Sequence, residues 1–247
     1  MAEVPAVSCL GLDFLPRSSR EGHRLRHRLK RVAREVQFKQ TIEADPTNAT
    51  NLGAYALFLS HVRHDPDGAE ALFRRAIEID PAHAINLGAY ARFLESVRHD
   101  PGAAYTYYER AVEVDPTNVS NLGHYAVMLR TMSWTYRQRA EEAAARPSNI
   151  HVFAHDLDRF RGNADQTEAQ LALDIESDPL NPISLGTYAY FLKTIRGDRR
   201  GAKAYFRRAI EADPTNVSNL IRYSILLDEM SDAHFKVVRE SRRSSAP

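Results

Sequence analysis

The sequence predicts an all-α fold, a right-handed α-solenoid built from stacked helix-turn-helix units. Two recurrences predict it. An Asp-Pro pair returns at a spacing of 35 residues, at Pro46, Pro81 and Pro116 and again at Pro179 and Pro214. A six-residue block recurs after these pairs, as NLGAYA, NLGAYA, NLGHYA and SLGTYA, starting at positions 51, 86, 121 and 184. Units of this size cannot bury an apolar face alone and must stack on their neighbours.

Each unit is predicted to begin with a helix that has one apolar side. Counted from the Pro, the apolar residues stand at plus 6, 9, 10 and 13, and this spacing places all four on one helical face. In the first unit they are Leu52, Tyr55, Ala56 and Leu59. The Asn two residues after the Pro, such as Asn48, suits the N-cap because its side chain can accept a hydrogen bond from the first turn.

The second helix of each unit is predicted from a small–aromatic–small pattern before the next Pro. Alanines such as Ala69 and Ala76 let two helices approach closely, and an aromatic residue fills the space between them. We therefore expect Phe73, Tyr108 and Phe206 to be buried between helices. The Pro closes this helix because the residue before a Pro is pushed out of the helical conformation.

The repeats divide the chain into six segments. They are an N-terminal tail (1–19), a basic capping helix (20–46), three repeats of which the third is degenerate (47–146), a degenerate fourth repeat (147–179), a fifth repeat (180–214), and C-terminal capping helices with a basic tail (215–247). In the third repeat, Trp134 to Ala145 is predicted to be a separate second helix. A polar helix at about 231–243 is predicted to follow the last first helix. Phe38 stands eight residues before Pro46, like the aromatic of a second helix.

The paired helices, the small–aromatic–small pattern and the closing Asp-Pro resemble the tetratricopeptide repeat (TPR), although each unit is one residue longer than the family's usual 34. The resemblance implies a non-enzymatic scaffold or adaptor that mediates protein–protein interaction, as a subunit or assembly factor of a larger complex. Two alternatives stay open. The period of 35 is also typical of pentatricopeptide RNA-binding repeats, and Glu109-Arg110-Ala111 resembles the half-TPR variant of RNA-processing proteins.

In TPR proteins the first helices build an inner face along which peptides lie. The resemblance places a candidate protein-binding groove on Asn51, Gly53, Leu57, Asn86, Gly88, Arg92, Asn121, Gly123, His124, Thr187, Tyr190 and Arg222, with Ile221 and Ile225 on the same face. A Gly costs a helix about 1 kcal/mol relative to Ala, so its recurrence needs a reason. Either successive first helices approach closely there, or the Gly and Asn residues open the face to a peptide.

The family's chaperone-binding members hold a terminal carboxylate with Lys and Asn at such positions. Here the same positions carry mostly Gly, Ala, Leu, Arg and Val. An internal protein or peptide segment, or a packed helix, is therefore the expected partner.

The basic residues gather near the N-terminus although the formal net charge is only +1. The predicted basic patch consists of Arg24, Arg26, Arg28, Lys30, Arg31 and Arg34. It is interpreted either as a solvated cap or as an RNA contact in a ribonucleoprotein-associated protein. Strong salt dependence of RNA binding would favour the second interpretation. The overall charge makes nucleic acid the less favoured partner.

Other motifs point to no chemistry. His151 and His155 lie four residues apart but lack a third metal ligand at a known spacing, and no catalytic motif is present, so no metal, cofactor or enzyme activity is expected. Arg63-His64-Asp65 is interpreted as a turn. Cys9 is the only cysteine, which fits a reducing compartment. No apolar run reaches the roughly 18 residues of a membrane span. A cytoplasmic location is expected, with weak support for organelle targeting.

Overall fold

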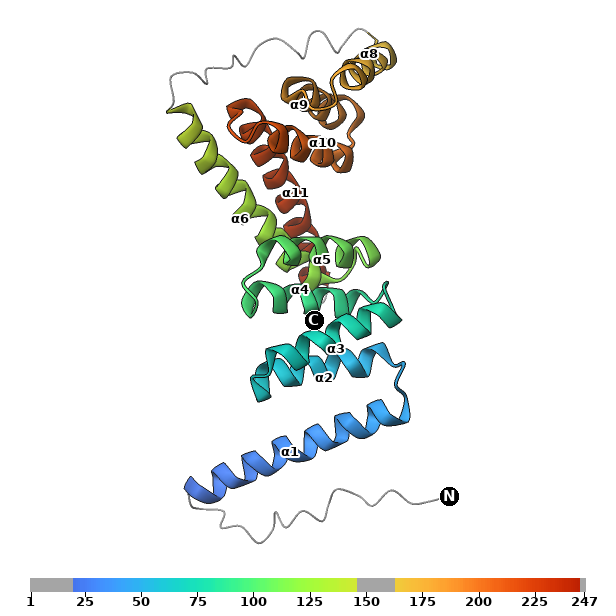
Figure 1. Cartoon of the computed structure of the whole chain (residues 1–247), viewed down its shortest axis with the longest axis vertical. Helices are drawn as coiled ribbons and strands as arrows, with labels where there is room; N and C mark the ends of the chain where they lie inside the picture. Colours follow the sequence, from blue (N-terminus) through green and yellow to red (C-terminus); the bar gives the residue numbers. More distant parts are fainter. Residues whose placement is uncertain (1–19, 146–162, 245–247) are drawn as a thin grey trace. The chain divides into compact units, whose positions relative to one another are not determined.

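The computed structural model describes residues 20–145 and 163–244, and of residues 20–23 and 26 it describes the backbone alone. Within these ranges the chain forms ten α-helices and no strand, which confirms the predicted all-α fold (Figure 1). The chain divides into two compact units, Met1–Asn121 and Leu122–Pro247. Each unit has its own stack of helices.

The first unit holds alternating first and second helices. They are α1 (Arg20–Ala44), α2 (Ala49–Phe58) with a short π-helical end η3 (Leu59–Arg63), α3 (Pro66–Ile79), α4 (Ala84–Ser96) and α5 (Pro101–Val114), and the unit ends in the first turn of α6 (Val119–Ala144). Two helix pairs dominate the packing, because α2 lies against α3 and α4 lies against α5. These pairs are the predicted helix-turn-helix units.

The helix ends follow the expected local chemistry. The side chain of Asn48 accepts a hydrogen bond from the backbone N–H of Asn51 at 3.0 Å, and Asp65 caps α3 in the same way at the N–H of Gly68. The first helices end at His64 and His99, each with a φ of 56°. A left-handed residue followed by a capping Asp breaks the chain between two helices. The interpretation of the Arg-His-Asp segments as turns is confirmed.

The predicted aromatic residues fill the space between helices. Phe73 is fully buried, and its ring centroid lies 5.5 Å from the centroids of Tyr90 and Phe93 on the next first helix. Phe38 on α1 makes the equivalent contacts with Tyr55 and Phe58, at 5.4 Å each. The C-terminal half of α1 is therefore a second helix, as Phe38 indicated. Tyr108 and Phe206 are fully buried as well.

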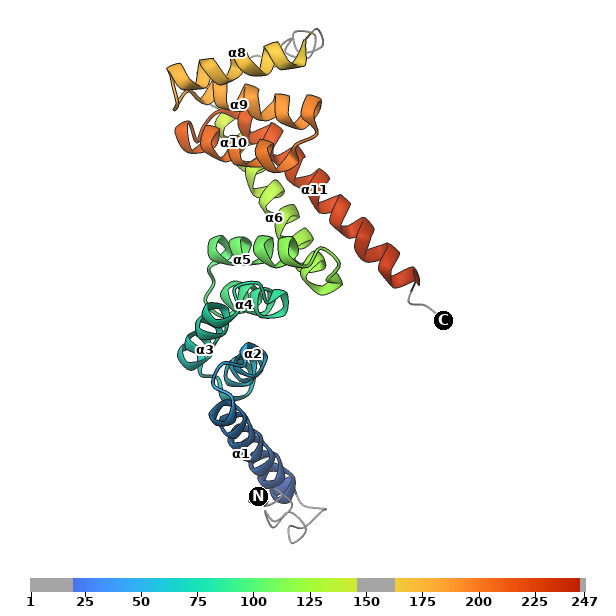
Figure 2. The same cartoon turned by 90° about the vertical axis from the view of Figure 1, so that its right-hand side faces the viewer.

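The second unit repeats this arrangement with different helix lengths. It contains α6 from Leu122 onward, α8 (Ala164–Ser177), α9 (Pro182–Phe191) with a π-helical end η4 (Leu192–Arg196), α10 (Arg199–Ala212) and α11 (Val217–Ser244). Figure 2 shows α8, α9 and α10 stacked in order, with α9 packed against both neighbours. The break between α9 and α10 uses Gly197, with a φ of 69°, and the capping Asp198.

Two helices run through positions where a break was predicted. α6 is continuous over Val119–Ala144, so the separate helix predicted at Trp134 to Ala145 is wrong, and α11 likewise absorbs the helix predicted at about 231–243. The reason is local. Ser133-Trp134 and Ser231-Asp232 stand where the other first helices have Arg63-His64 or Arg196-Gly197, and no left-handed residue or capping Asp-Pro follows them.

Within the second unit, α6 and α11 pack side by side in opposite directions (Figure 1). The hydroxyl of Ser231 donates to the carbonyl oxygen of Ala126 at 2.8 Å, and the rings of Tyr136 and Tyr223 meet edge to face at 4.8 Å between centroids. Ion pairs such as Arg130–Asp232 flank the contact. Small residues at the crossing allow the two long helices to approach closely.

Several predictions about segments stay predictions. The predicted tail (1–19) and part of the predicted fourth repeat (147–179), including His151 and His155, lie outside the described residues. The handedness of the superhelix and the division into five repeats also remain untested.

Candidate functional site

The recurrent Gly and Asn residues meet each other between neighbouring first helices. The side-chain amide of Asn86 donates to the carbonyl oxygen of Ala49 at 2.8 Å, and a Cβ added to Gly53 would lie 2.0 Å from the Asn86 side-chain oxygen. Gly88 and Asn121 form the next such pair, and Gly186 and Asn219 form one in the second unit. We call each of these pairs a Gly–Asn joint.

The joints explain the Gly recurrence by close approach of helices. Asn86 and Asn121 are only 3% and 6% exposed, and their amide groups are already bonded to the backbone. This corrects the expectation that Asn86 and Asn121 present hydrogen-bonding groups to a ligand, because both side chains are used inside the stack. Gly53 and Gly88 are buried beneath those amides rather than open to a groove.

The remaining candidate groove residues differ in accessibility. Arg92 and His124 are exposed, and Asn51, Leu57, Gly123, Thr187 and Tyr190 are half-buried. Among the described residues, a Cβ on Gly123 would meet nothing within 4 Å, so Gly123 makes no such joint with any of them. In the second unit the guanidinium of Arg222 lies 4.4 Å from the ring centroid of Tyr190, which brings those two candidate residues together.

A second recurring contact joins three of the second helices, α1, α3 and α8, to the first helix that follows. A Glu accepts a hydrogen bond from a Tyr hydroxyl 20 residues later, at 3.2–3.4 Å, and pairs with an Arg 28 residues later. The three sets are Glu35–Tyr55–Arg63, Glu70–Tyr90–Arg98 and Glu168–Tyr188–Arg196. Hydrogen bonds from Lys39 and Arg63 hold the pKa of Glu35 below its usual value. Burial works to raise the pKa of Glu70, but hydrogen bonds from Arg74 and Arg98 outweigh it and the pKa is lowered.

The set is altered where the chain enters α11. Lys203 stands where α1, α3 and α8 carry Glu35, Glu70 and Glu168, and Ser231 stands where those sets have their Arg. Lys203 is only 5% exposed. Burial, with the nearby charge of Arg207, lowers the pKa of Lys203 to about 8. The contact that ends a first helix elsewhere is thus missing where α11 continues.

The space between α6 and α11 is an apolar groove in the second unit. Its walls are Ala140 and Ala144 from α6 and Val217, Ile221 and Ile225 from α11, with Arg137, Glu141 and Ser224 beside them, and its volume is about 410 Å³. We call it the α6/α11 groove. Ile221 and Ile225 lie on the face predicted from the repeat. The α6 wall was missed because Trp134 to Ala145 was assigned to a different helix. The lack of a breaking residue after Leu129 is the signal that could have revealed it.

One comparison with known protein families matches part of the chain. Residues 194–216, which cover the end of η4, α10 and the following Asp-Pro turn, match the family model described as tetratricopeptide repeat. This match identifies a tetratricopeptide repeat in the second unit. The matched segment has the predicted order, because the end of a first helix is followed by a second helix and a closing Asp-Pro.

Solved structures similar to this chain share little sequence with it. MamA is 14% identical over 79% of this chain and 95% of its own, with a TM-score of 0.37. YrrB, whose structure is described as a TPR protein with an unusual peptide-binding site, is 20% identical over 74% and 95%, with a TM-score of 0.36. PilF of Pseudomonas aeruginosa is 14% identical over 89% and 87%, with a TM-score of 0.38. The comparison with curated proteins gave no match.

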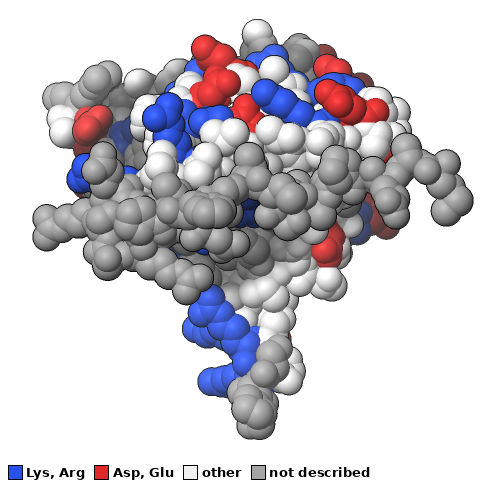
Figure 3. Space-filling model, turned by 90° about the horizontal axis from the view of Figure 1, so that it is seen from below, with Lys and Arg blue, Asp and Glu red and all other residues white. Residues whose placement is uncertain are grey.

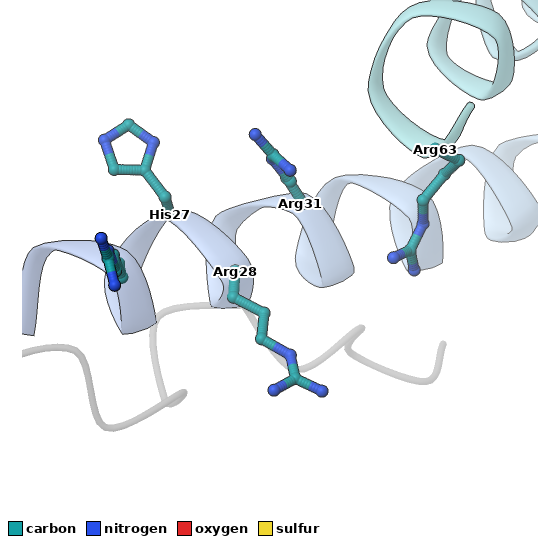
Figure 4. A pocket seen from close by; sticks show the side chains of 5 residues that line it. His27, Arg28, Arg31 and Arg63 are labelled. Carbon is teal, nitrogen blue, oxygen red and sulfur yellow. The ribbon is translucent and has the colours of Figure 1, made fainter. Parts of the chain in front are cut away.

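The predicted basic patch of the chain lies on α1. Arg24, His27, Arg28 and Arg31 line a shared hollow with Arg63, which reaches across from η3 (Figure 4). In Figure 4, His27 and Arg31 extend from one side of α1 and Arg28 points away from them. Lys30 and Arg34 are also exposed, with the Arg34 guanidinium 5.9 Å from the Phe38 ring centroid, and the side chain of Arg26 lies outside the described residues.

Further basic residues lie near the C-terminal end of α11. Lys236, Arg239, Arg242 and Arg243 stand on the last turns of α11, where Figure 3 shows Lys and Arg side chains gathered. Among the residues that the structure describes, no three His, Cys, Asp or Glu side chains are placed to hold a metal ion. No helix in the described ranges is long and apolar enough to cross a membrane.

Proposed function

We propose that this TPR chain is a non-enzymatic scaffold or adaptor that holds a segment of a protein partner in the α6/α11 groove, as a subunit or assembly factor of a larger complex. The observation that carries the proposal is the groove itself. Its walls are aliphatic, and Ile225 is 41% exposed although it is a large apolar side chain. Apolar side chains that stay accessible between two helices are typical of sites that receive an apolar anchor residue.

The charges around the groove favour a protein segment over a nucleic acid. Arg137 pairs with Asp228 on α11, so the best-placed basic group is already neutralised by an acidic one. Glu141 adds a negative charge on the α6 side. A groove with an apolar floor and mixed charges at its rim suits a peptide or helix that buries one or two aliphatic or aromatic residues.

The neighbouring first-helix face extends this surface. Ile183 on α9 is 60% exposed, and the stacked pair of Arg222 and Tyr190 connects α9 with α11. Binding along this face would place further partner residues on the second unit without changing the stack. The reducing, cytoplasmic setting expected from the single Cys9 is part of the same proposal.

The test places a carboxylate in the groove. The position of Ile225 is partly exposed, so Ile225→Asp should keep the helical content. The substitution should strongly reduce capture of the native partner, which is identified by affinity purification and mass spectrometry. Leu180→Asp is the matched control, because Leu180 is 75% exposed in the turn before α9 and away from the groove. Capture that survives Ile225→Asp as well as it survives Leu180→Asp would refute the proposed site.

A further inference from the structure

The helix α1 is longer than its place in the repeat requires. The other described second helices, α3, α5, α8 and α10, each have 14 residues, whereas α1 has 25. In α3 the helix begins 15 residues before the closing Pro, and by that count α1 should begin at 31. The residues before 31 therefore extend α1 beyond the stack.

This extended helix carries an apolar stripe on its outer side. Leu25, Leu29, Val32 and Val36 follow one another at spacings of 4, 3 and 4 residues, which places them within a sector of roughly 60°. Leu25, Val32 and Val36 are 41%, 39% and 45% exposed. The stripe spans about 16 Å along the helix axis. We call these four residues the outer stripe.

The outer stripe has no counterpart in the other repeats. Val32 and Val36 stand 14 and 10 residues before the closing Pro. At those two positions α3 has Asp67 and Ala71, α5 has Gly102 and Thr106, α8 has Asp165 and Ala169, and α10 has Arg200 and Ala204. None of these is a large apolar residue. The stack itself therefore does not need Val32 or Val36, since Phe38 already supplies the contact with the next helix.

Most of the charged residues that border the stripe are basic. Around the helix axis Arg28 lies nearest to the stripe. Arg24, Lys30 and Arg31 lie farther from it on the same helix. Between residues 24 and 34 the sequence has no Asp or Glu, and Glu35 is already paired with Lys39 and Arg63. The spacings of 4, 3 and 4 are those of a coiled-coil seam, in which the flanking charges select the partner.

We propose that the outer stripe of α1 binds an amphipathic helix of a protein partner whose own flanks are acidic. This surface lies in the first unit and is independent of the α6/α11 groove. A second copy of the chain fits less well, because it would bring one row of Arg and Lys against another. An anionic membrane fits less well because the stripe is made of Leu and Val, without the aromatic residues of interfacial helices. RNA would use the arginines and leave the apolar stripe exposed.

The probe is a synthetic peptide of three heptads with Leu at the core positions and Glu at the flanking positions, labelled for fluorescence anisotropy with the full chain. Its control has Lys in place of every flanking Glu. The Glu peptide should bind and the Lys peptide should not. The charge-reversed variant Arg24→Glu with Arg28→Glu should lose the Glu peptide and gain the Lys peptide, because the flanks then have the opposite sign.

A matched pair of variants separates the apolar stripe from general charge attraction. Val32→Asp with Val36→Ala removes two exposed apolar side chains from α1, and the circular dichroism signal is measured to check that the helix is kept. The double substitution should weaken Glu-peptide binding by at least about tenfold. Leu173→Asp removes an exposed Leu from α8 with the same gain of charge and should leave the affinity unchanged. Equal weakening by both variants, or by neither, would overturn the proposal.

Binding of a membrane, an RNA or a second copy of the chain to the outer stripe is tested separately. Phosphatidylserine vesicles, poly(U) RNA and the chain's own self-association are measured with the same variants. If the Glu peptide fails to bind while vesicles, RNA or a second copy bind in a manner lost in Val32→Asp with Val36→Ala, the proposed partner is wrong.

Discussion

A Gly–Asn joint can be tested by giving one Gly a methyl group. In Gly88→Ala the new Cβ would lie 2.0 Å from the side-chain oxygen and 2.7 Å from the Cγ of Asn121, far inside van der Waals contact. Asn121 would have to leave its place and lose the hydrogen bond to the carbonyl oxygen of Ala84. The repeat provides its own control, because a Cβ at Gly123 would meet nothing within 4 Å.

The magnitude follows from three contributions. Leaving a buried polar group unsatisfied costs about 1–3 kcal/mol, and overpacking adds about 1–3 kcal/mol. Replacing a helical Gly by Ala returns about 1 kcal/mol. Gly88→Ala should therefore lower the free energy of unfolding by roughly 1–5 kcal/mol, whereas Gly123→Ala should be neutral or more stable by up to about 1 kcal/mol.

The assay is urea unfolding followed by circular dichroism, with the wild type and both variants measured side by side. The double variant Gly88→Ala with Asn121→Ala should recover part of the loss, because the clash disappears and the two substitutions are energetically coupled. If Gly88→Ala is as stable as Gly123→Ala, the Gly does not serve the close approach of helices and the reasoning fails.

Three further outcomes follow from the packing and charges. Phe73→Ala should cost roughly 3–5 kcal/mol in urea unfolding, since its ring is fully buried between helices, and a loss below about 1 kcal/mol would contradict the assigned packing. Arg98→Ala should lower the free energy of unfolding only slightly at pH 7, because solvent screens an exposed ion pair. The pKa of Glu70 is lowered in the folded state, so the ionised Glu70 stabilises the fold above its unfolded pKa. This stabilisation is lost as the pH falls and Glu70 becomes protonated. Between pH 5 and 3, acid titration should therefore show a larger loss of stability for the wild type than for Arg98→Ala. In the folded chain Lys203 has a pKa of about 8, below its value in the unfolded chain, so it loses its proton more easily when folded. Raising the pH from about 8 toward 10 should therefore stabilise the wild type relative to Lys203→Met in thermal melts. Parallel pH dependences of the two melting temperatures would refute this.

The repeat architecture could be predicted because its signals are local. The spacing of the Asp-Pro pairs, the apolar residues at plus 6, 9, 10 and 13, and the capping Asn and Asp residues all act within a few residues of one another. The same local reasoning would have shown α6 to be continuous, since neither Ser133 nor Trp134 is a residue that breaks a helix. The expectation of a regular repeat outweighed that observation.

The candidate site could be predicted only in part, because it depends on contacts between distant residues. Gly53 and Asn86 recur visibly, but whether they face a ligand or each other depends on the distance between two helices. The α6/α11 groove needs Ala140 and Ile225, which are 85 residues apart and meet only through the antiparallel packing of two long helices. No pattern within either segment contains that information.

The Gly–Asn joint has a consequence for how such a chain can grow. Each joint takes its Gly from one unit and its Asn from the next, and each of the first three units carries both residues, as in Asn86 and Gly88. A tandem duplication of such a 35-residue unit therefore supplies both residues of a new Gly–Asn joint, with no compensating substitution. Selection could change the number of units before it changed any contact. Within the described residues Gly123 makes no joint, so a change at this Gly is not constrained by an Asn among them.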